Sequence, residues 1–234
     1  MNWKAPKIWD GGECWIIGGG PSIWDQFHIP SEVVENVLCG KYQYSALSPY
    51  LSCIHDAHVI GVNNAYLLGT WVDFMFFGDC GYYLAHKTRL DAFPGIKVTC
   101  CPRFASRTKA AEAQVKYLAK DRDKPKGISN SSYKVSWNSN SGAAAISMAV
   151  HFGVKRILLL GFDMCLSKGY SHWHGHHGIP GTKRKTSPPF KRHLMGFPQI
   201  AADAKALHVE ILNMNPNSEI DCFPRWSVDQ LVRT

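Results

Sequence analysis

A short apolar segment that runs directly into a glycine-rich turn is the feature that most constrains this chain. Residues 14–17 read Cys-Trp-Ile-Ile, and residues 18–22 read Gly-Gly-Gly-Pro-Ser. Glycines at a strand end let the backbone approach an anion, and a following helix offers unpaired N–H groups. We therefore expect a phosphate-sized nest here, although a tight structural turn has the same sequence. The donor-binding residues expected in the nest are Gly18, Gly19, Gly20 and Ser22.

Two common nucleotide-binding motifs do not fit this turn. No Lys-Ser or Lys-Thr pair follows the glycines, as a Walker loop requires, and residues 18–23 lack the last glycine of the dinucleotide fingerprint. The turn therefore indicates a nucleotide-like ligand without matching either class.

A second unit, in residues 141–163, predicts the architecture. A small-residue helix over 141–153 closes with glycine, and a continuous apolar strand over 156–161 leads to Phe162 and Asp163. Helix, short turn, buried strand and acid are typical of a parallel α/β sheet. Further strands are expected at 59–64, 74–79, 96–100 and 209–213, and helices at 110–119 and 198–207.

The whole chain of 234 residues has a size that suits one domain. We expect an α/β fold over 1–234: a Rossmann-like, mostly parallel sheet flanked by helices, with a small basic lid or loop excursion. Excursions are expected near 120–139, where the sequence is polar and rich in Gly, Ser and Asn, and near 166–195. The first of these reads equally well as a plain connector.

Polar residues follow several of the predicted strands. Ligands of such sheets bind at the carboxyl ends of the strands, so we expect these residues to gather around one nucleotide. The candidates for donor binding are Asn63, Asn64, Asp79, Ser141, Gly142, Asn217 and Ser218. Ser141 is expected at the N-cap of its helix, either in contact with a phosphate or as a cap alone.

Four histidines lie within residues 171–178, Ser-His-Trp-His-Gly-His-His-Gly. Imidazole titrates near neutral pH, so these side chains suit a general base, a metal ligand or a phosphate donor. His172, His174 and His176 alternate, and on an extended backbone they would share one face, with Asp79 or Asp163 completing a metal shell. No HExxH spacing, which is typical of one class of zinc site, is present. The alternative interpretation is that these histidines are exposed in a loop and have no chemical role.

The charge balance favours an anionic partner. Lys and Arg total 26 against 18 Asp and Glu, a net charge of +8, and much of the excess lies in 116–126 and 183–193. Each basic segment reads equally well as a solvated loop. The eight cysteines include no CxxC pair, so we expect mostly buried thiols and no disulfide framework. No apolar run approaches 18 residues and no signal peptide is evident, which predicts a cytoplasmic protein with no membrane span.

Six short motifs, taken in order, resemble a known family. They are Gly-Gly-Gly-Pro-Ser at 18–22, Val-Asn-Asn-Ala-Tyr at 62–66, Asn-Ser-Gly at 140–142, Gly-Phe-Asp at 161–163, Ser-His-Trp-His-Gly-His at 171–176 and Asn-Pro-Asn-Ser at 215–218. The order is similar to that of bacterial lipo-oligosaccharide sialyltransferases and of motility-associated flagellin glycosyltransferase-like domains. The resemblance covers most of the chain, from about Trp15 to Pro224.

The resemblance implies a metal-independent glycosyltransferase that needs no cofactor and uses a nucleotide-sugar as co-substrate. Gly19 and Ser22 would line the donor phosphates, with Asn63, Ser141 and Gly142 at the nucleotide. Asn217 and Ser218 would hold the base or ribose. His176, matching the second histidine of the family's Ser-His-x-x-Gly-His stretch, would take a proton from the acceptor hydroxyl. His174 and Asp163 are further catalytic candidates.

Departures from the family leave the donor and acceptor open. The family has a tyrosine after Gly-Phe-Asp that assists the leaving phosphate, whereas this chain has Met164 and Cys165; Tyr170, Tyr82 or Tyr83 is a substitute. The family's lid is shortened, and a basic segment follows the histidines instead. The acceptor-binding candidates are Trp173, Lys183, Arg184, Lys185, Lys191 and Arg192.

Two kinds of acceptor and two other classes of function remain open. The compact basic build looks similar to small proteins of tailed bacteriophages, so a hydroxymethylated base in phage DNA, modified in the host cytoplasm, is one acceptor; a glycan or protein hydroxyl is the other. A Mg²⁺-dependent pterin diphosphokinase-like transferase would use Asp79 and Asp163. A non-catalytic nucleic-acid or zinc-binding protein is the remaining alternative, and nothing in the sequence indicates an oligomeric state.

Overall fold

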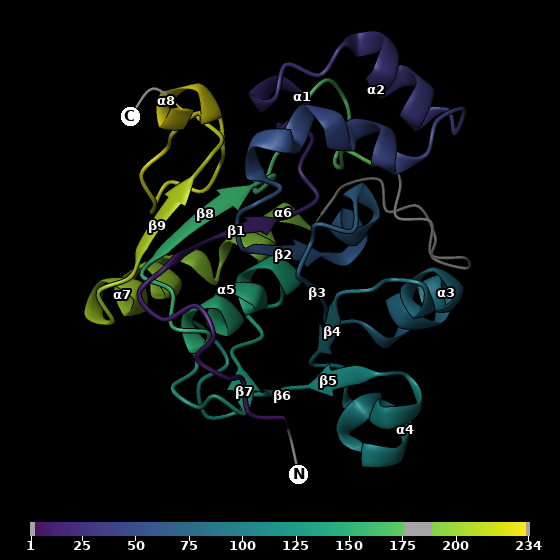
Figure 1. Cartoon of the computed structure of the whole chain (residues 1–234). Helices are drawn as coiled ribbons and strands as arrows, with labels where there is room; N and C mark the ends of the chain where they lie inside the picture. The colour runs from purple at the N-terminus through teal and green to yellow at the C-terminus, as the bar shows by residue number, and fades with distance from the viewer. Residues whose placement is uncertain (1–2, 176–188, 233–234) are drawn as a thin grey trace.

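The computed structural model describes residues 3–175 and 189–232. Its centre is an all-parallel sheet of seven strands in the order β5-β4-β3-β2-β1-β8-β9, flanked by helices (Figure 1). The prediction of an α/β, Rossmann-like parallel sheet is therefore confirmed.

The elements have the following bounds. The strands are β1 Glu13–Ile17, β2 Val59–Val62, β3 Phe74–Phe77, β4 Ile96–Thr99, β5 Val115–Tyr117, β6 Ala119–Lys120, β7 Lys134–Val135, β8 Arg156–Leu160 and β9 Glu210–Asn213. The α-helices are α1 Ile23–Gln26, α2 Ser31–Leu38, α3 Cys80–Asp91, α4 Arg107–Glu112, α5 Ser141–His151, α6 Phe190–Leu194, α7 Phe197–Ala206 and α8 Val228–Val232. Three 3₁₀ helices are η1 Tyr44–Ile54, η2 Asn63–Leu68 and η3 Pro102–Ala105.

Each face of the sheet carries its own hydrophobic core, because side chains alternate along a strand. Trp15 and Ile17 of β1 pack with α1, α2, α3 and η1 on one face. Cys14 and Ile16 face the opposite way, toward α5 and α7. Both faces of β1 are buried, which explains why the strands read as continuous apolar runs rather than alternating ones.

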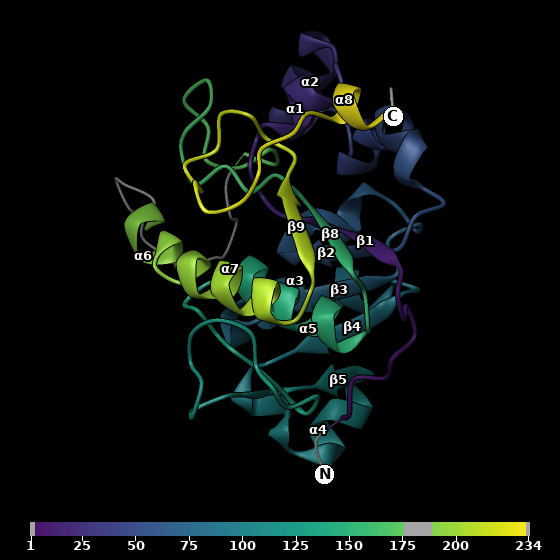
Figure 2. The same cartoon turned by 90° about the vertical axis from the view of Figure 1, so that its left-hand side faces the viewer.

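The connections around β1 create the point where a ligand of such a sheet is expected. From β1 the chain builds β2, β3, β4 and β5 toward one edge, then returns through α5 to place β8 and β9 on the other side of β1. The carboxyl ends of β1 and β8 therefore diverge at a topological switch point, where open α/β sheets bind their ligands. Figure 2 shows α6 and α7 following one another beside β9.

One predicted helix, at 110–119, is wrong. Helix α4 starts earlier and ends at Glu112, Gln114 takes a positive φ of 51°, and residues 115–117 pair with β4 as the edge strand β5. Val115 and Tyr117 are β-branched and aromatic residues that favour a strand. Pairing with β4 outweighed the helix-forming alanines before them.

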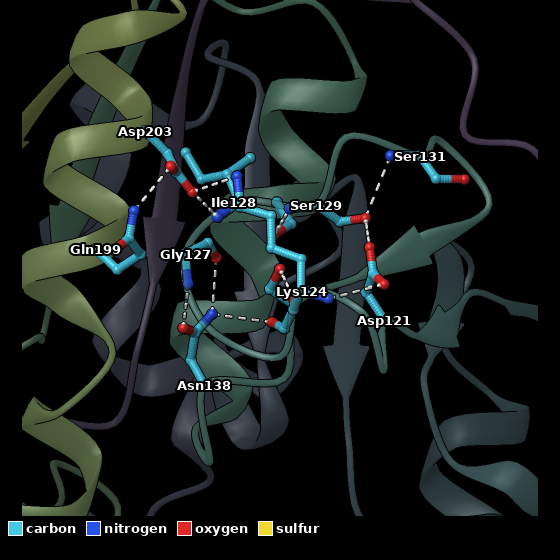
Figure 3. Close-up of polar contacts among 11 residues, drawn as sticks. Asp121, Lys124, Gly127, Ile128, Ser129, Ser131, Asn138, Gln199 and Asp203 are labelled. Carbon is cyan, nitrogen blue, oxygen red and sulfur yellow. Dashed lines mark hydrogen bonds and ion pairs between the residues drawn. The ribbon is translucent and has the colours of Figure 1, made fainter.

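The segment near 120–139, expected as an excursion, contains a pair of short strands and several side-chain hydrogen bonds. Strands β6 and β7 pair in parallel, and the side chains of Asp121 and Asn138 hold the loop between them (Figure 3). Asp121 accepts from Ser129 Oγ at 2.6 Å. Asn138 Oδ1 accepts from the backbone N–H of Gly127, and Asn138 Nδ2 donates to the carbonyl oxygen of the same residue.

The cysteines differ in part from expectation. Cys80, at the start of α3, and Cys101, just after β4, form a disulfide that joins the carboxyl ends of β3 and β4. Cys14 and Cys100 are buried thiols as expected, but Cys39 and Cys53 are exposed. The two bridged residues are 21 positions apart, so only the folded sheet brings them together.

Among the residues that the structure describes, no helix combines the length and the apolar character needed to cross a bilayer.

Candidate functional site

The glycine turn lies at the switch point and is closely packed there. Gly18 N donates to the Leu160 carbonyl oxygen and Gly20 N to the Gly161 carbonyl oxygen, each at 2.7 Å. A Cβ atom on Gly18 would lie 2.7 Å from the Gly161 carbonyl oxygen and 3.1 Å from the Phe162 ring. Glycine is needed because the segments after β1 and β8 approach backbone to backbone. The expected turn is present, and two of its N–H groups bond to the neighbouring segment.

Trp173 fastens the histidine segment to this turn. Its backbone N–H donates to the Gly19 carbonyl oxygen at 2.8 Å, and its indole N–H donates to the Gly18 carbonyl oxygen at 2.9 Å. The side chain is fully buried. The expectation placed this tryptophan against an acceptor, whereas the structure places it in the core, where the indole body packs and its polar nitrogen is satisfied.

Asp163 lies beneath the glycine turn as a buried carboxyl, 2% exposed. Its oxygens accept from the Ser22 backbone N–H at 2.8 Å, the Ser22 hydroxyl at 2.5 Å and the Asn215 side-chain amide at 3.0 Å. Burial raises the pKa of Asp163, while the hydrogen bonds from Ser22 and Asn215 act to lower it. The carboxyl thus joins three segments that are far apart in the sequence.

The turn after β9 packs against the segment that follows β8. Ser218 Oγ donates to the Phe162 carbonyl oxygen at 2.7 Å and accepts from Asn213 Nδ2 at 2.9 Å. Ser218 is buried, whereas Asn217 is exposed and its N–H donates to Asn215 Oδ1. Of the two residues expected at the base or ribose, Asn217 is the one that faces outward.

A buried chain of side chains orients His174, which is 4% exposed. The Tyr82 hydroxyl donates to Asn64 Oδ1 at 3.0 Å, and Asn64 Nδ2 lies 3.3 Å from His174 Nδ1. Because an amide nitrogen only donates, this contact makes Nδ1 the acceptor and leaves the ring proton of the neutral form on Nε2. Burial raises the pKa of Tyr82, so its hydroxyl stays protonated and keeps donating.

Two more members of the expected site lie nearby in the chain. His172 is half-buried, its Nδ1 lies 2.8 Å from Ser171 Oγ, and its ring centroid is 5.0 Å from that of His174. Asn63 opens η2 with a positive φ of 51° and is half-buried. His176, Lys183, Arg184 and Lys185 lie outside the described residues. Lys191 and Arg192 are exposed on α6.

The N-terminus of α5 points to the same end of the sheet. Asn140, not Ser141, is the N-cap: its Oδ1 accepts from Gly142 N at 2.8 Å and Ala143 N at 3.3 Å. Ser141 occupies the first helical position and is half-buried. A Cβ atom on Gly142 would lie 2.8 Å from the Phe162 ring, the same ring that limits the space for a side chain at Gly18. The Nδ2 atom of Asn140 is buried and has no hydrogen-bond partner among the residues that the structure describes.

Sequence reasoning missed Trp137, which completes this edge of the site. Its ring fills the space that a side chain on Gly78 would occupy, and the hydroxyl of Ser141 borders the same position. Lys120 Nζ lies 3.8 Å from the centre of the ring, within cation–π distance. Asp79, which follows Gly78, is exposed and caps α3 by accepting from Gly81 N at 2.8 Å. The signal available was an aromatic residue four positions before the helix start.

Within the described parts of the chain, no three His, Cys, Asp or Glu side chains are grouped so that they could hold a metal ion. His176 and His177 lie outside those parts.

The fold is similar to that of a known transferase. The structure superposes on the sialyltransferase CstII from Campylobacter jejuni in complex with the substrate analogue CMP-3FNeuAc with a TM-score of 0.51 and 16% sequence identity, covering 92% of this chain and 86% of that chain. A tyrosine-to-phenylalanine variant of the same enzyme in complex with CMP gives a TM-score of 0.49 and 15% identity, with the same coverage. No protein-family model and no curated protein sequence matches the chain.

Proposed function

We propose that this protein transfers a sugar from a nucleotide-sugar to an acceptor hydroxyl, with His176 as the general base. One observation carries the proposal: the two hydrogen bonds of Trp173 fasten the histidine segment directly to the glycine turn at the switch point of a sialyltransferase-like sheet. The described part of the histidine segment therefore contacts the glycine turn, which the family resemblance links to the donor phosphates. A fold alone does not assign an activity.

The donor side of the proposed site is the space bordered by the glycine turn and the N-terminus of α5. Gly19, Ser141 and Gly142 would lie along the nucleotide, as the family resemblance implies. The helix contributes the positive end of its dipole, and Asn140 Nδ2, which no described residue bonds, would be a further donor at that end. Trp137 offers an aromatic face next to Ser141 for a base or a sugar.

The other residues expected at the site are assigned positioning roles or lie at its surface. The hydrogen bond between Ser22 and Asp163 links the glycine turn to the segment after β8. The hydroxyl of Ser218 links the turn after β9 to the same segment by donating to the Phe162 carbonyl oxygen. Asn64 and Tyr82 orient the ring of His174, which belongs to the same histidine segment of the sequence as His176. Asn63 is half-buried, and the exposed residues among those expected are Asp79, Asn217, Lys191 and Arg192.

In the proposed reaction, the bond between the anomeric carbon and the phosphate oxygen breaks as the acceptor oxygen bonds to that carbon. His176 takes the proton of the acceptor hydroxyl, and the electron pair of the broken bond stays on the departing nucleotide phosphate. Hydrogen-bond donors at the helix terminus would stabilise the charge that develops on that phosphate. Catalysis is proposed to require no metal ion, and the acceptor class stays open between a DNA base, a glycan and a protein hydroxyl.

The decisive experiment measures release of nucleotide from a panel of nucleotide-sugars, beginning with CMP-linked sialic acid. We expect His176→Ala to lower kcat by about 100-fold or more, because the general base is lost, while the Kd for the nucleotide changes little. Turnover should persist in EDTA. His208→Ala removes an exposed imidazole between α7 and β9 and serves as the control. Unchanged turnover in His176→Ala would reject the assigned base, and complete loss in EDTA would favour the Mg²⁺-dependent class.

A further inference from the structure

A second site lies away from the switch point, along the edge strand β5. A hollow of about 850 Å³ runs between the loop that precedes β4, helix α4 and the first residues described at the N-terminal end. Strands β4, β3 and β2 separate β5 from β1, so this hollow and the glycine turn belong to different parts of the sheet (Figure 1). Its volume is typical of ligand-binding clefts. We call it the β5 groove.

The lining of the β5 groove is strongly basic. Lys4, Lys97, Arg107 and Lys116 border it, and none of the described residues that line it is acidic. Lys4, Arg107 and Lys116 are exposed, and none of these three forms an ion pair within the described parts of the chain. Cations without counter-charges around a concave surface create a positive potential that attracts an anionic ligand.

Lys97 differs from the other three because it has an internal role. It is 4% exposed, and its Nζ donates to the Leu90 carbonyl oxygen in the last turn of α3 at 3.2 Å. This contact is that of a lysine that caps a helix C-terminus. The argument for a ligand in the β5 groove therefore rests on the three exposed cations. The buried Lys97 adds positive charge to the lining.

Aromatic side chains accompany the cations. Trp3, Tyr117 and Tyr133 line the same groove, and Tyr133 is 40% exposed. Surface aromatic rings next to unpaired lysines and arginines form the combination with which proteins bind single-stranded nucleic acid: the rings stack on bases and the cations follow the phosphates. A site for an isolated inorganic anion would have no use for the exposed ring of Tyr133.

We propose that the β5 groove binds a single strand of nucleic acid, with Lys116 and Arg107 at phosphates and Tyr133 against a base. This site does not depend on the proposed transfer activity. The basic segment at 116–126, which the sequence left unassigned, contributes Lys116 and Tyr117 to it. Every proposed contact comes from β5, α4 or the neighbouring loops, so a strand would follow the sheet edge rather than enter the switch point.

The test is fluorescence anisotropy with a labelled oligothymidine and the whole protein, without any nucleotide-sugar. The double variant Arg107→Ala with Lys116→Ala should weaken binding about tenfold and reduce the slope of log K against log salt by about one to two. The matched control is Arg103→Ala with Lys109→Ala, which removes the same charge from η3 and α4 outside the groove. Equal weakening by both pairs would overturn the proposal, because net charge alone would then explain it.

A second arm separates nucleic acid from a general polyanion. Tyr133→Ala should weaken oligothymidine binding about fivefold through lost stacking, while Tyr42→Ala, which removes a ring of equal exposure elsewhere, should not. Inorganic polyphosphate of equal charge should compete poorly. Full competition by polyphosphate together with no effect of Tyr133→Ala would reject the nucleic-acid assignment. His176→Ala should bind the oligonucleotide like wild type, so failure of the transferase proposal leaves this result intact.

Discussion

Two regions of this molecule place aspartates in opposite surroundings. In the excursion, the buried Asp121 pairs with Lys134 at 3.5 Å and accepts a hydrogen bond from Ser129 Oγ. Where the excursion meets α7, the half-buried Asp203 of that helix pairs with Lys124 at 2.8 Å and accepts a hydrogen bond from Ile128 N (Figure 3). At the switch point, Asp163 has only neutral donors, and no ion pair forms to it within the described residues.

The pKa values show the difference. For Asp121 and Asp203, burial raises the pKa, but the hydrogen bonds and the lysines outweigh it and the net shift is downward. For Asp163, burial dominates and the net shift is upward. The surroundings of Asp121 and Asp203 thus stabilise the ionised carboxylates. At the switch point, the hydrogen bonds to Asp163 do not outweigh the effect of burial on its pKa.

The largest expected effect comes from removing the carboxyl at the switch point. Asp163→Ala leaves the Ser22 N–H, the Ser22 hydroxyl and the Asn215 amide without their acceptor in a buried place. Each buried unsatisfied donor costs about 1–3 kcal/mol, so we expect the free energy of unfolding to fall by about 4 kcal/mol. Urea denaturation measures it, with the exposed Asp56→Ala as control. A loss below about 1 kcal/mol would show that the three segments do not depend on this carboxyl.

A smaller effect is expected in the excursion. Asp203→Ala removes the ion pair with Lys124 and the hydrogen bond from Ile128 N, at the junction between the excursion and α7. Lys124 is partly solvated, so we expect a loss of about 2 kcal/mol in the free energy of unfolding. Glu112→Ala on exposed α4 is the control. If Asp203→Ala cost more than Asp163→Ala, the order of the two regions would be reversed.

The subtlest effect is the pH dependence of two isosteric variants. A raised folded pKa means that wild type gains stability as Asp163 becomes protonated, so the destabilisation caused by Asp163→Asn should grow as the pH falls from 7 toward the ordinary aspartate value of 3.8. A lowered folded pKa means the reverse for Asp203. Its contribution is complete above 3.8 and is lost as the pH falls further, so the effect of Asp203→Asn should shrink there. Urea denaturation at several pH values measures both effects. If the destabilisation by the two variants changed in the same direction with pH, the contrast between Asp163 and Asp203 would be wrong.

Local sequence patterns correctly predicted the positions of many strands and helices. The strand at 96–100, the helix that begins at Ser141 and the strand that ends at Leu160 all lie where hydrophobic runs and glycine stops place them. The errors arise where the deciding contact is distant or the element is short. Strand β5 has three residues and exists through its pairing with β4, and the cap of α5 moved by one residue to Asn140.

The candidate site divides in the same way. Residue types alone indicated the glycine turn and the histidine segment, because each consists of consecutive residues whose types suggest its chemistry. The fastening of one to the other by Trp173, the meeting of Ser22 with Asp163 across 141 positions, and the placing of Trp137 against Gly78 depend on which strands become neighbours. Local sequence therefore determined the elements and their chemistry, since backbone preference and burial act over a few residues. Tertiary structure decided which of those groups meet, since strand order joins segments that are far apart along the chain.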